Sequence, residues 1–109
     1  MEDALKAIAE PHRRQILRLV WQQELSAGEV ASRFPLTRPA VSIHLRVLKN
    51  AGLVAERRQG TRRLYRARPE GLAGLRAFLE EFWTDSLAQL KTAAEAEQQR
   101  SSERDARGA

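Results

Sequence analysis

The chain has 109 residues, a length that suits one domain with a modest hydrophobic core. It contains no cysteine, which excludes disulfides, thiolate metal ligation and thiol redox sensing, and its 42% hydrophobic and 30% charged residues are ordinary for a soluble helical protein. No apolar run has the length of a membrane span, and the N-terminal MEDALKAIAE is acidic and amphipathic, unlike a signal peptide. We therefore expect a cytoplasmic protein.

Positive charge is concentrated in the central third of the sequence. The net charge is +5, but residues 36–68 contain nine Lys and Arg against the single acid Glu56, so this stretch carries +8 and the remainder −3. A block of one sign usually marks an interaction surface, and a basic block is the footprint of a polyanion-binding surface. The alternative is a solvated face without a partner.

Two helices are expected ahead of the basic stretch. Residues 2–9 can form a short helix with Leu5 and Ile8 inward, and Pro11 begins a second helix to about Gln23, because the residue before a proline avoids the α region. Four residues form the apolar face of this second helix: Ile16, Leu17, Val20 and Trp21.

The side chains of Arg13 and Arg14 lie mostly outside that face. They either touch phosphate or are solvated surface charges, and the sequence does not separate these two interpretations.

Two short helices joined by a tight turn occupy the middle of the chain. Ser26 and Glu29 form the capping-box pattern S-x-x-E, which predicts the start of a helix that Pro35 ends. A second helix is expected over residues 37–50, so that only Pro35 and Leu36 separate the two. This arrangement predicts a helix-turn-helix whose second helix recognises DNA.

The predicted recognition helix has one apolar side and one small, polar, basic side. Val41, Leu45 and Leu48 recur at helical spacing, and Gly52 stops the helix with a residue that accepts positive φ. The opposite side presents Pro39, Ser42, Ile43 and Arg46, with Arg38 and Lys49 towards its edges. The major groove of DNA admits one helix and is contacted by short side chains and arginine, so this pattern favours DNA recognition.

A β-hairpin is predicted directly after this helix. Residues 53–58 and 61–66 alternate in polarity, and Gln59-Gly60 between them is a turn signal. A hairpin with arginines at its tip, following a recognition helix, is typical of a wing that contacts the phosphate backbone or the adjacent minor groove. An isolated hairpin is marginal in water, so we expect Leu53, Leu64 and Tyr65 to pack it onto the helices.

A long helix is expected from residue 71 to about Ala94. Its apolar residues recur at steps of three and four, at Leu72, Leu75, Leu79, Phe82, Trp83, Leu87, Leu90 and Ala94. Such a stripe is too long for a small domain to bury, which favours a dimerisation helix paired with the partner's first helix over one that folds back. The expected interface is formed by Leu5, Ile8, Leu75, Leu79, Phe82, Trp83, Leu87 and Leu90.

The expected fold is mainly α with a small β-hairpin, a winged helix-turn-helix with a long C-terminal dimerisation helix. Residues 1–94 would form this DNA-binding domain, and the polar residues 95–109 are expected to be a disordered tail.

With these elements in this order, the chain resembles the ArsR/SmtB family of bacterial winged-helix repressors. The resemblance covers about residues 2–94, is most specific over residues 39–54, and is carried by residues 10–17, 26–31, 37–48, 51–54 and 58–65. Trp83 in the last helix favours the metal-free, autorepressor-like branch.

The resemblance implies a homodimer whose recognition helices enter successive major grooves of a near-palindromic operator. Thr37, Arg38, Ser42 and His44 would face DNA, and Ile43 either contacts a thymine methyl or is tolerated there. The candidate DNA-binding residues are Thr37, Arg38, Pro39, Ser42, Ile43, His44, Arg46, Arg57, Arg58, Gln59, Arg62, Arg63 and Tyr65.

The chain departs from the metal-sensing members of the family. Their E-L-C-x-C-D motif falls on residues 24–29, where Ser26 and Gly28 stand at the two thiol positions. Their C-terminal metal site needs histidines on the last helix, but the chain has only His12 and His44. Borderline metals favour Cys and imidazole ligands, so we predict no metal sensing, and we expect no cofactor.

Other classes of function fit less well. An enzyme is disfavoured because the two His are far apart in sequence, and the chain lacks Cys and a Gly-rich phosphate loop. A protein–protein adaptor has no need of +8 on one face, and an RNA-binding module would offer more stacking aromatics than Tyr65 alone. Non-specific DNA binding is a further alternative. The sequence does not identify an inducer, because Trp21, Phe82 and Trp83 either line a small apolar pocket or are part of the hydrophobic core.

Overall fold

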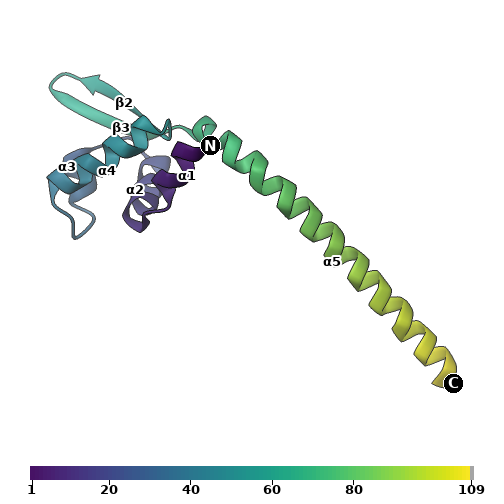
Figure 1. Cartoon of the computed structure of the whole chain (residues 1–109). Coiled ribbons are helices and arrows are strands. Elements are labelled where there is room, and N and C mark those ends of the chain that lie inside the picture. The colour runs from purple at the N-terminus through teal and green to yellow at the C-terminus, as the bar shows by residue number, and fades with distance from the viewer. Residues whose placement is uncertain (109) are drawn as a thin grey trace. The chain divides into compact units, whose positions relative to one another are not determined.

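The computed structural model describes residues 1–108, with side chains for residues 1–104. The chain forms two units, a folded domain over Met1–Leu75 and a single helix from Arg76 onward (Figure 1). No described helix combines the length and the hydropathy needed to cross a membrane.

Helices α1 (Glu2–Ile8) and α2 (Pro11–Gln22) meet at Glu10-Pro11, as predicted. The Glu10 carboxylate caps α2 by accepting a hydrogen bond from the Arg13 backbone N–H at 2.9 Å. The side chains of Arg13 and Arg14 return to the end of α1, where Arg13 Nε donates to Ala7 O at 2.7 Å and Arg14 Nη1 donates to Ile8 O at 2.7 Å. These two arginines therefore satisfy the free carbonyls of α1.

The inward faces of α1 and α2 differ from the prediction at two positions. Helix α1 packs against α2 and α4 through Ala4 and Ala7, which are buried, while Leu5 is 45% exposed. On α2, Val20 takes the inward position, and the next residue, Trp21, is 43% exposed.

Helices α3 (Ala27–Ala31) and α4 (Arg38–Asn50) form the helix-turn-helix. The predicted capping box is present, with the Glu29 N–H donating to Ser26 Oγ at 3.2 Å and the Ser26 N–H donating to Glu29 Oε1 at 3.1 Å. The expected two-residue connection is wrong, since α3 ends at Ala31 and residues 32–37 form the turn. The N–H groups of Arg33 and Phe34 bond carbonyls three residues back, which tightens the chain and ends the α-helix early.

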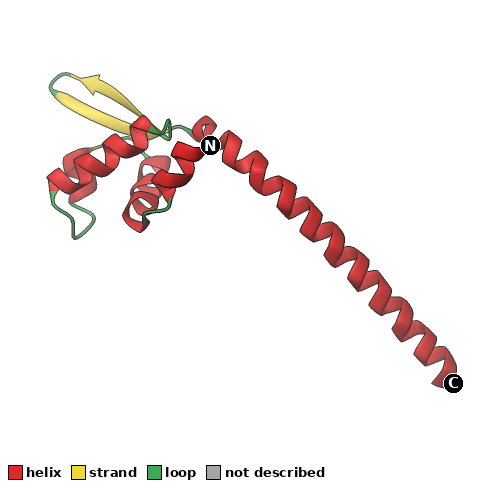
Figure 2. Ribbon diagram, viewed as in Figure 1, coloured by secondary structure: helices red, strands yellow, loops and turns green. Residues whose placement is uncertain are grey.

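Strands β2 (Val54–Gln59) and β3 (Arg62–Ala67) form the predicted hairpin beside the helices (Figure 2). A two-residue strand β1 (Leu25–Ser26) adds to the other edge of β3, giving an antiparallel sheet in the order β1-β3-β2. Leu25 pairs with Tyr65, and both side chains are buried in the core. Strand β1 thereby fastens the wing to the helix-turn-helix.

The core lies between α2, α3, α4 and the sheet. As predicted, α4 buries Val41, Leu45 and Leu48 completely, and Leu53 and Tyr65 join them from the wing. Leu64 is buried too but lies outside this cluster, because it alternates with Tyr65 along β3 and points to the other face of the sheet.

A close backbone contact joins the end of α4 to the end of the wing. Gly52 ends α4 with φ of +78°, as predicted for a residue free of a Cβ. The short 3-10 helix η1 (Pro69–Leu72) crosses it so closely that a Cβ on Gly71 would lie 2.1 Å from Gly52 O.

Helix α5 (Ala73–Gly108) has 36 residues and passes well beyond the expected end at Ala94. A helix thus takes the place of the disordered tail expected over residues 95–108, and residue 109 lies outside the described residues. The reason is that no Gly or Pro interrupts the chain between Gly74 and Gly108, and that Arg100 and Arg104 pair along the helix with Glu97 at 2.9 and 3.1 Å.

Candidate nucleic-acid interface

Helix α4 is held rigidly with one face free. Thr37 caps its first turn by accepting from the Ala40 N–H at 3.3 Å, and Pro39 occupies the first turn, where an N–H is not required. Arg38, Ile43 and Arg46 are exposed on this helix, and Ile43 is 56% exposed.

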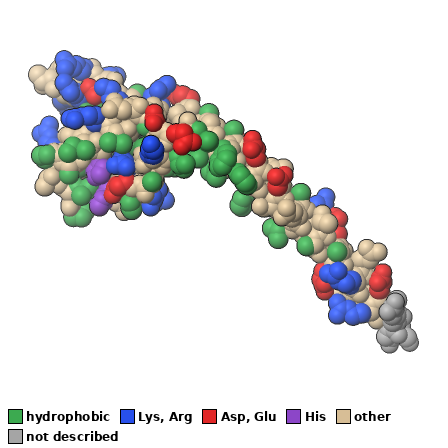
Figure 3. All heavy atoms as spheres, in the orientation of Figure 1, with side chains coloured by type: hydrophobic (Ala, Val, Ile, Leu, Met, Phe, Trp, Pro, Cys, Tyr) green, Lys and Arg blue, Asp and Glu red, His purple; other side chains and the backbone are tan. Residues whose placement is uncertain are grey.

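An open groove of about 900 Å³ lies between α4, the start of α3 and the wing. Six of the predicted DNA-binding residues line it, namely Arg38, Ser42, Arg46, Arg62, Arg63 and Tyr65. Lys and Arg side chains gather over the hairpin above it (Figure 3). The fold therefore brings Lys and Arg side chains from two separate stretches of sequence into one basic, concave surface.

Two carboxylates lie among these Lys and Arg side chains. Glu56 lies 3.2 Å from Lys49 Nζ and 3.7 Å from Arg63 Nε, and its side chain is only 17% exposed. Glu29 accepts from Arg62 as well as from Ser26. Hydrogen bonds from the backbone and hydroxyl of Ser26, followed by the charge of Arg62, hold the pKa of Glu29 below its usual value.

Tyr65 forms part of the groove wall rather than a projecting contact. Its ring is buried, and burial together with the nearby charge of Glu56 raises the pKa of its hydroxyl.

The remaining predicted residues lie outside the groove lining. Thr37, Pro39 and Ile43 are exposed on the first half of α4. Arg57, Arg58 and Gln59 are exposed on β2, and Arg57 points to the opposite face of the sheet from Glu56, where its Nε donates to Glu24 Oε2 at 3.1 Å. Groove residues that were not among the predicted DNA-binding residues include Lys49, Asn50, Glu29 and Glu56.

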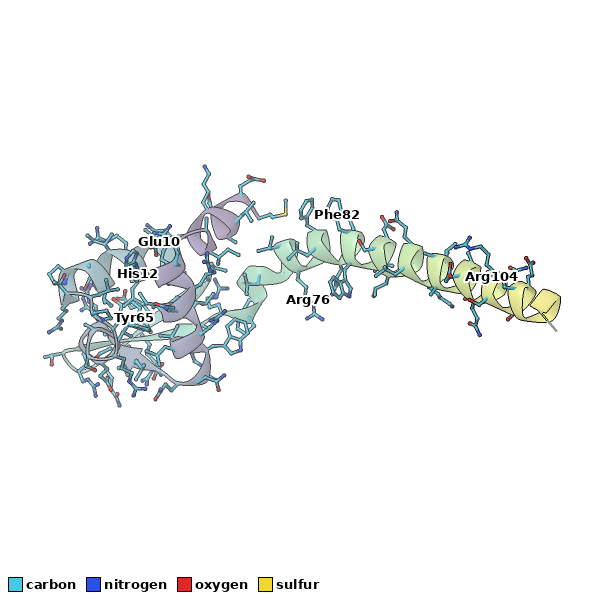
Figure 4. The ribbon with its side chains drawn as sticks, turned by 90° about the horizontal axis from the view of Figure 1, so that it is seen from below. Glu10, His12, Tyr65, Arg76, Phe82 and Arg104 are labelled. Atoms are coloured by element: carbon cyan, nitrogen blue, oxygen red, sulfur yellow. The ribbon has the colours of Figure 1, made fainter. Side chains whose placement is uncertain are left out.

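His44 is half-buried and faces α2 rather than the groove. Its Nδ1 accepts from Arg13 Nη1 at 3.5 Å, and its ring lies 5.9 Å from that of His12 between centroids. His12 Nδ1 in turn bonds Glu10 Oε1 at 3.0 Å, and Figure 4 labels both residues at the start of α2. Although the two His are far apart in sequence, the fold brings them together.

This group of Glu10, His12 and His44 offers one ligand atom each within 4.8 Å of the others. Two features oppose its use as a metal site. The guanidinium of Arg13 contacts His44 and adds a positive charge, and Glu10 is engaged as the cap of α2. The cluster adds polar contacts between α4 and α2 to those of the apolar core, and Arg13 also donates to Ala7 O of α1.

Helix α5 carries an exposed apolar surface. Leu79, Phe82, Trp83, Leu87 and Leu90 are each at least half exposed, and Phe78 and Phe82 meet edge to face at 5.0 Å. Figure 4 shows Phe82 and Arg76 projecting from opposite sides of the helix. Of the other residues expected at a dimer interface, Leu5 is exposed and Ile8 is partly buried, whereas Leu75 is buried within the folded domain.

A helix-turn-helix followed by a basic hairpin defines a winged helix-turn-helix protein. Residues 10–56 match the family described as bacterial regulatory protein, arsR family. The chain is 49% identical to the HTH-type transcriptional regulator Rv2034 of Mycobacterium tuberculosis over 84 residues, covering 77% of this chain and 78% of the relative. It is 38% identical to the transcriptional repressor SdpR of Bacillus subtilis over 60 residues, covering 55% and 67%.

Among solved structures, the chain is similar to a homodimeric winged helix-turn-helix DNA-binding domain, Mb0332 of Mycobacterium bovis. The TM-score is 0.62 and the identity 34%, over 77% of this chain and 78% of that one. The chain therefore belongs to the ArsR family and is a DNA-binding transcriptional regulator, not an enzyme.

Proposed function

We propose that the protein is a sequence-specific, homodimeric repressor that binds a near-palindromic operator in double-stranded DNA. The observation that carries this proposal is α4, whose apolar side is completely buried while Arg38, Ser42 and Arg46 border a basic groove. Repression would follow from occlusion of a promoter, and the name of the repressor SdpR supports this direction. The working compartment would be the cytoplasm, with the protein associated with the nucleoid through DNA.

Recognition and affinity would come from different parts of the interface. Arg38, Ser42 and Arg46 would contact base edges, and Ile43 would contact a thymine methyl group. Thr37 and His44 would also face DNA, and Pro39 and Ala40 would support the close approach of α4. On the wing, Arg58, Gln59, Arg62 and Arg63 would contact phosphates, which supply affinity without sequence preference and make it salt-dependent.

The dimer would form through α5. Its row of half-exposed Leu, Phe and Trp side chains is a surface that soluble proteins normally cover. Leu5, which is exposed on α1, would also contribute to the dimer interface. The similar Mb0332 domain is described as homodimeric, which supports the same assembly here. Two recognition helices in one dimer would match the two halves of a palindromic operator.

The proposed regulator does not sense metal. Ser26 and Gly28 stand where thiolate ligands would be required, Ser26 is engaged in the capping box, and the Glu10–His12–His44 group contains the guanidinium of Arg13. A purified dimer that retained stoichiometric zinc or nickel would contradict this part of the proposal.

Fluorescence anisotropy tests the function as a whole. The purified protein is titrated into its own upstream promoter DNA and into a scrambled duplex, each across a salt series. Tight binding to the promoter with two protomers per site is the expected result. Equal, salt-sensitive binding to both duplexes would instead indicate a non-specific DNA-binding protein, and binding to neither would indicate a winged-helix adaptor.

A further inference from the structure

The groove holds two kinds of basic side chain. Lys49 and Arg63 share the carboxylate of Glu56, and Arg62 is bound to the carboxylate of Glu29. By contrast, Arg38 and Arg46 on α4 form no ion pair with any described residue.

The two carboxylates are held in place by other contacts as well as by the Lys and Arg side chains. Glu56 belongs to β2, its side chain is 83% covered, and it lies close to the hydroxyl of Tyr65. Glu29 is fixed by the capping box, where its Oε1 also accepts from the Ser26 N–H. Each carboxylate therefore presents an anionic oxygen at a fixed place in the groove.

A phosphate oxygen takes the same donors as a carboxylate oxygen, namely Lys and Arg N–H groups in charge-assisted hydrogen bonds. We propose that Glu29 and Glu56 serve, in the free protein, as the anionic partners of Lys49, Arg62 and Arg63, and that on DNA binding these three side chains exchange the carboxylates for DNA phosphates. This inference rests on the proposed function, because it concerns how the same groove meets DNA.

The exchange lowers the affinity of the groove for DNA without changing its preference between DNA sequences. Each of the three Lys and Arg side chains gives up a carboxylate to bind a phosphate. The released carboxylate stays near the negatively charged DNA backbone. The groove therefore binds phosphate less tightly than its number of Lys and Arg residues suggests. Every DNA sequence has the same phosphates, so operator and random DNA are affected alike. The unpaired Arg38 and Arg46 remain available for base edges.

Two substitutions remove the charge and retain the fold. Glu29→Gln keeps the capping box, because Gln serves at this position as Glu does. Glu56→Gln keeps a polar side chain beside Tyr65. The full chain and each variant are titrated into the promoter duplex and the scrambled duplex across a KCl series, with circular dichroism to verify folding.

Both variants are expected to bind both duplexes several-fold more tightly at low salt, with an unchanged ratio between the duplexes. The slope of log K against log[KCl] is expected to steepen by up to about 0.9 for each carboxylate removed, the value for one phosphate contact. Glu97→Gln, which makes the same charge change on α5, is expected to leave the slope unchanged.

A double-mutant cycle tests whether Glu29 acts through Arg62. In the Arg62→Ala background, Glu29→Gln is expected to change neither affinity nor slope. The proposal is overturned if Glu29→Gln and Glu56→Gln leave the slope as in the wild type, if Glu97→Gln steepens it equally, or if the effect of Glu29→Gln persists without Arg62. A wild-type chain that binds neither duplex would refute the proposed function and the exchange together.

Discussion

The folded domain and helix α5 treat apolar side chains in opposite ways. Over Met1–Leu75 most large apolar residues of α2, α4 and the sheet are buried, with Ile16, Leu45 and Leu53 at 0% exposure, and Trp21 and Ile43 are exceptions. Beyond Leu75 the large apolar residues are exposed, with Trp83 at 68% and Leu90 at 66%. The first unit has a complete core, whereas the second needs a further surface to cover it, so their stabilities should respond differently to the same change.

Replacing leucine by alanine in each unit gives the largest expected contrast. Leu45→Ala removes a fully buried side chain and should lower the free energy of unfolding of the domain by about 2–5 kcal/mol. Leu87→Ala removes a half-exposed one and should leave that free energy unchanged while raising the dimer dissociation constant. Urea unfolding at protein concentrations below the dimer dissociation constant measures the stability of the domain, and sedimentation equilibrium measures the dissociation constant. An equal loss of domain stability in both variants would contradict the comparison.

Two glycines near the junction sharpen the comparison. Gly71→Ala would place a Cβ 2.1 Å from Gly52 O, a backbone atom that cannot turn aside, and should destabilise the domain by about 1–3 kcal/mol. Gly74→Ala meets only Met1 Cβ at 3.7 Å and should be neutral or stabilising by about 0.4–1 kcal/mol. Thermal unfolding measures both, and a similar Tm for the two variants would show that the close contact is absent in solution.

Within the folded domain, α4 and the wing should differ in what they contribute to DNA binding. Arg38→Ala should relax choice at one operator position, with about 1–3 kcal/mol less discrimination. Arg62→Ala with Arg63→Ala should weaken binding to all DNA and flatten the salt slope, because both contacts are with phosphate. Anisotropy with single-base operator variants measures these effects. If Arg38→Ala weakened binding to operator and random DNA equally, Arg38 would not be a residue that contacts base edges.

The smallest expected effect is a loss of stability in acid. Hydrogen bonds from Arg57 hold the pKa of Glu24 below the ordinary value of 4.5, and those from Ser26 do the same for Glu29. Because both folded-state pKa values are lowered, their stabilisation is fully present above the ordinary value and is lost as the pH falls through the lowered ones. Thermal unfolding between about pH 6 and about pH 3 should show a shallower decline for Glu29→Gln than for the wild type.

The elements of the DNA-binding domain could be predicted because their signals are local. Proline after Glu10, the capping box at Ser26, the Thr37 cap and the alternation around Gly60 each fix a boundary through residues close in sequence. The hairpin strands and the buried face of α4 agree with these predictions for that reason. Helix α3 is shorter than predicted because hydrogen bonds of the turn, invisible in the sequence pattern, end it before Pro35.

The parts that sequence reasoning missed depend on contacts between distant segments. Strand β1 exists only because Leu25 and Ser26 meet β3, about 40 residues further on. His44, whose contact with DNA stays a prediction, also meets Arg13 of α2, which lies 31 residues earlier in the chain. Of the groove carboxylates, Glu56 did have a signal, as the single acid in a basic stretch, whereas nothing local connects Glu29 with Arg62.

The antiparallel pairing of β1 with β3 has a consequence for the behaviour of the free protein in solution. A two-stranded hairpin has two open edges that can template pairing with another chain. Strand β1 closes part of one edge of β3, and the opposite edge strand of the sheet, β2, carries three consecutive charged residues, Glu56, Arg57 and Arg58. Charged residues on an edge strand discourage the addition of a foreign strand, so the side chains that suit the wing to DNA also keep it from aggregating when no DNA is bound.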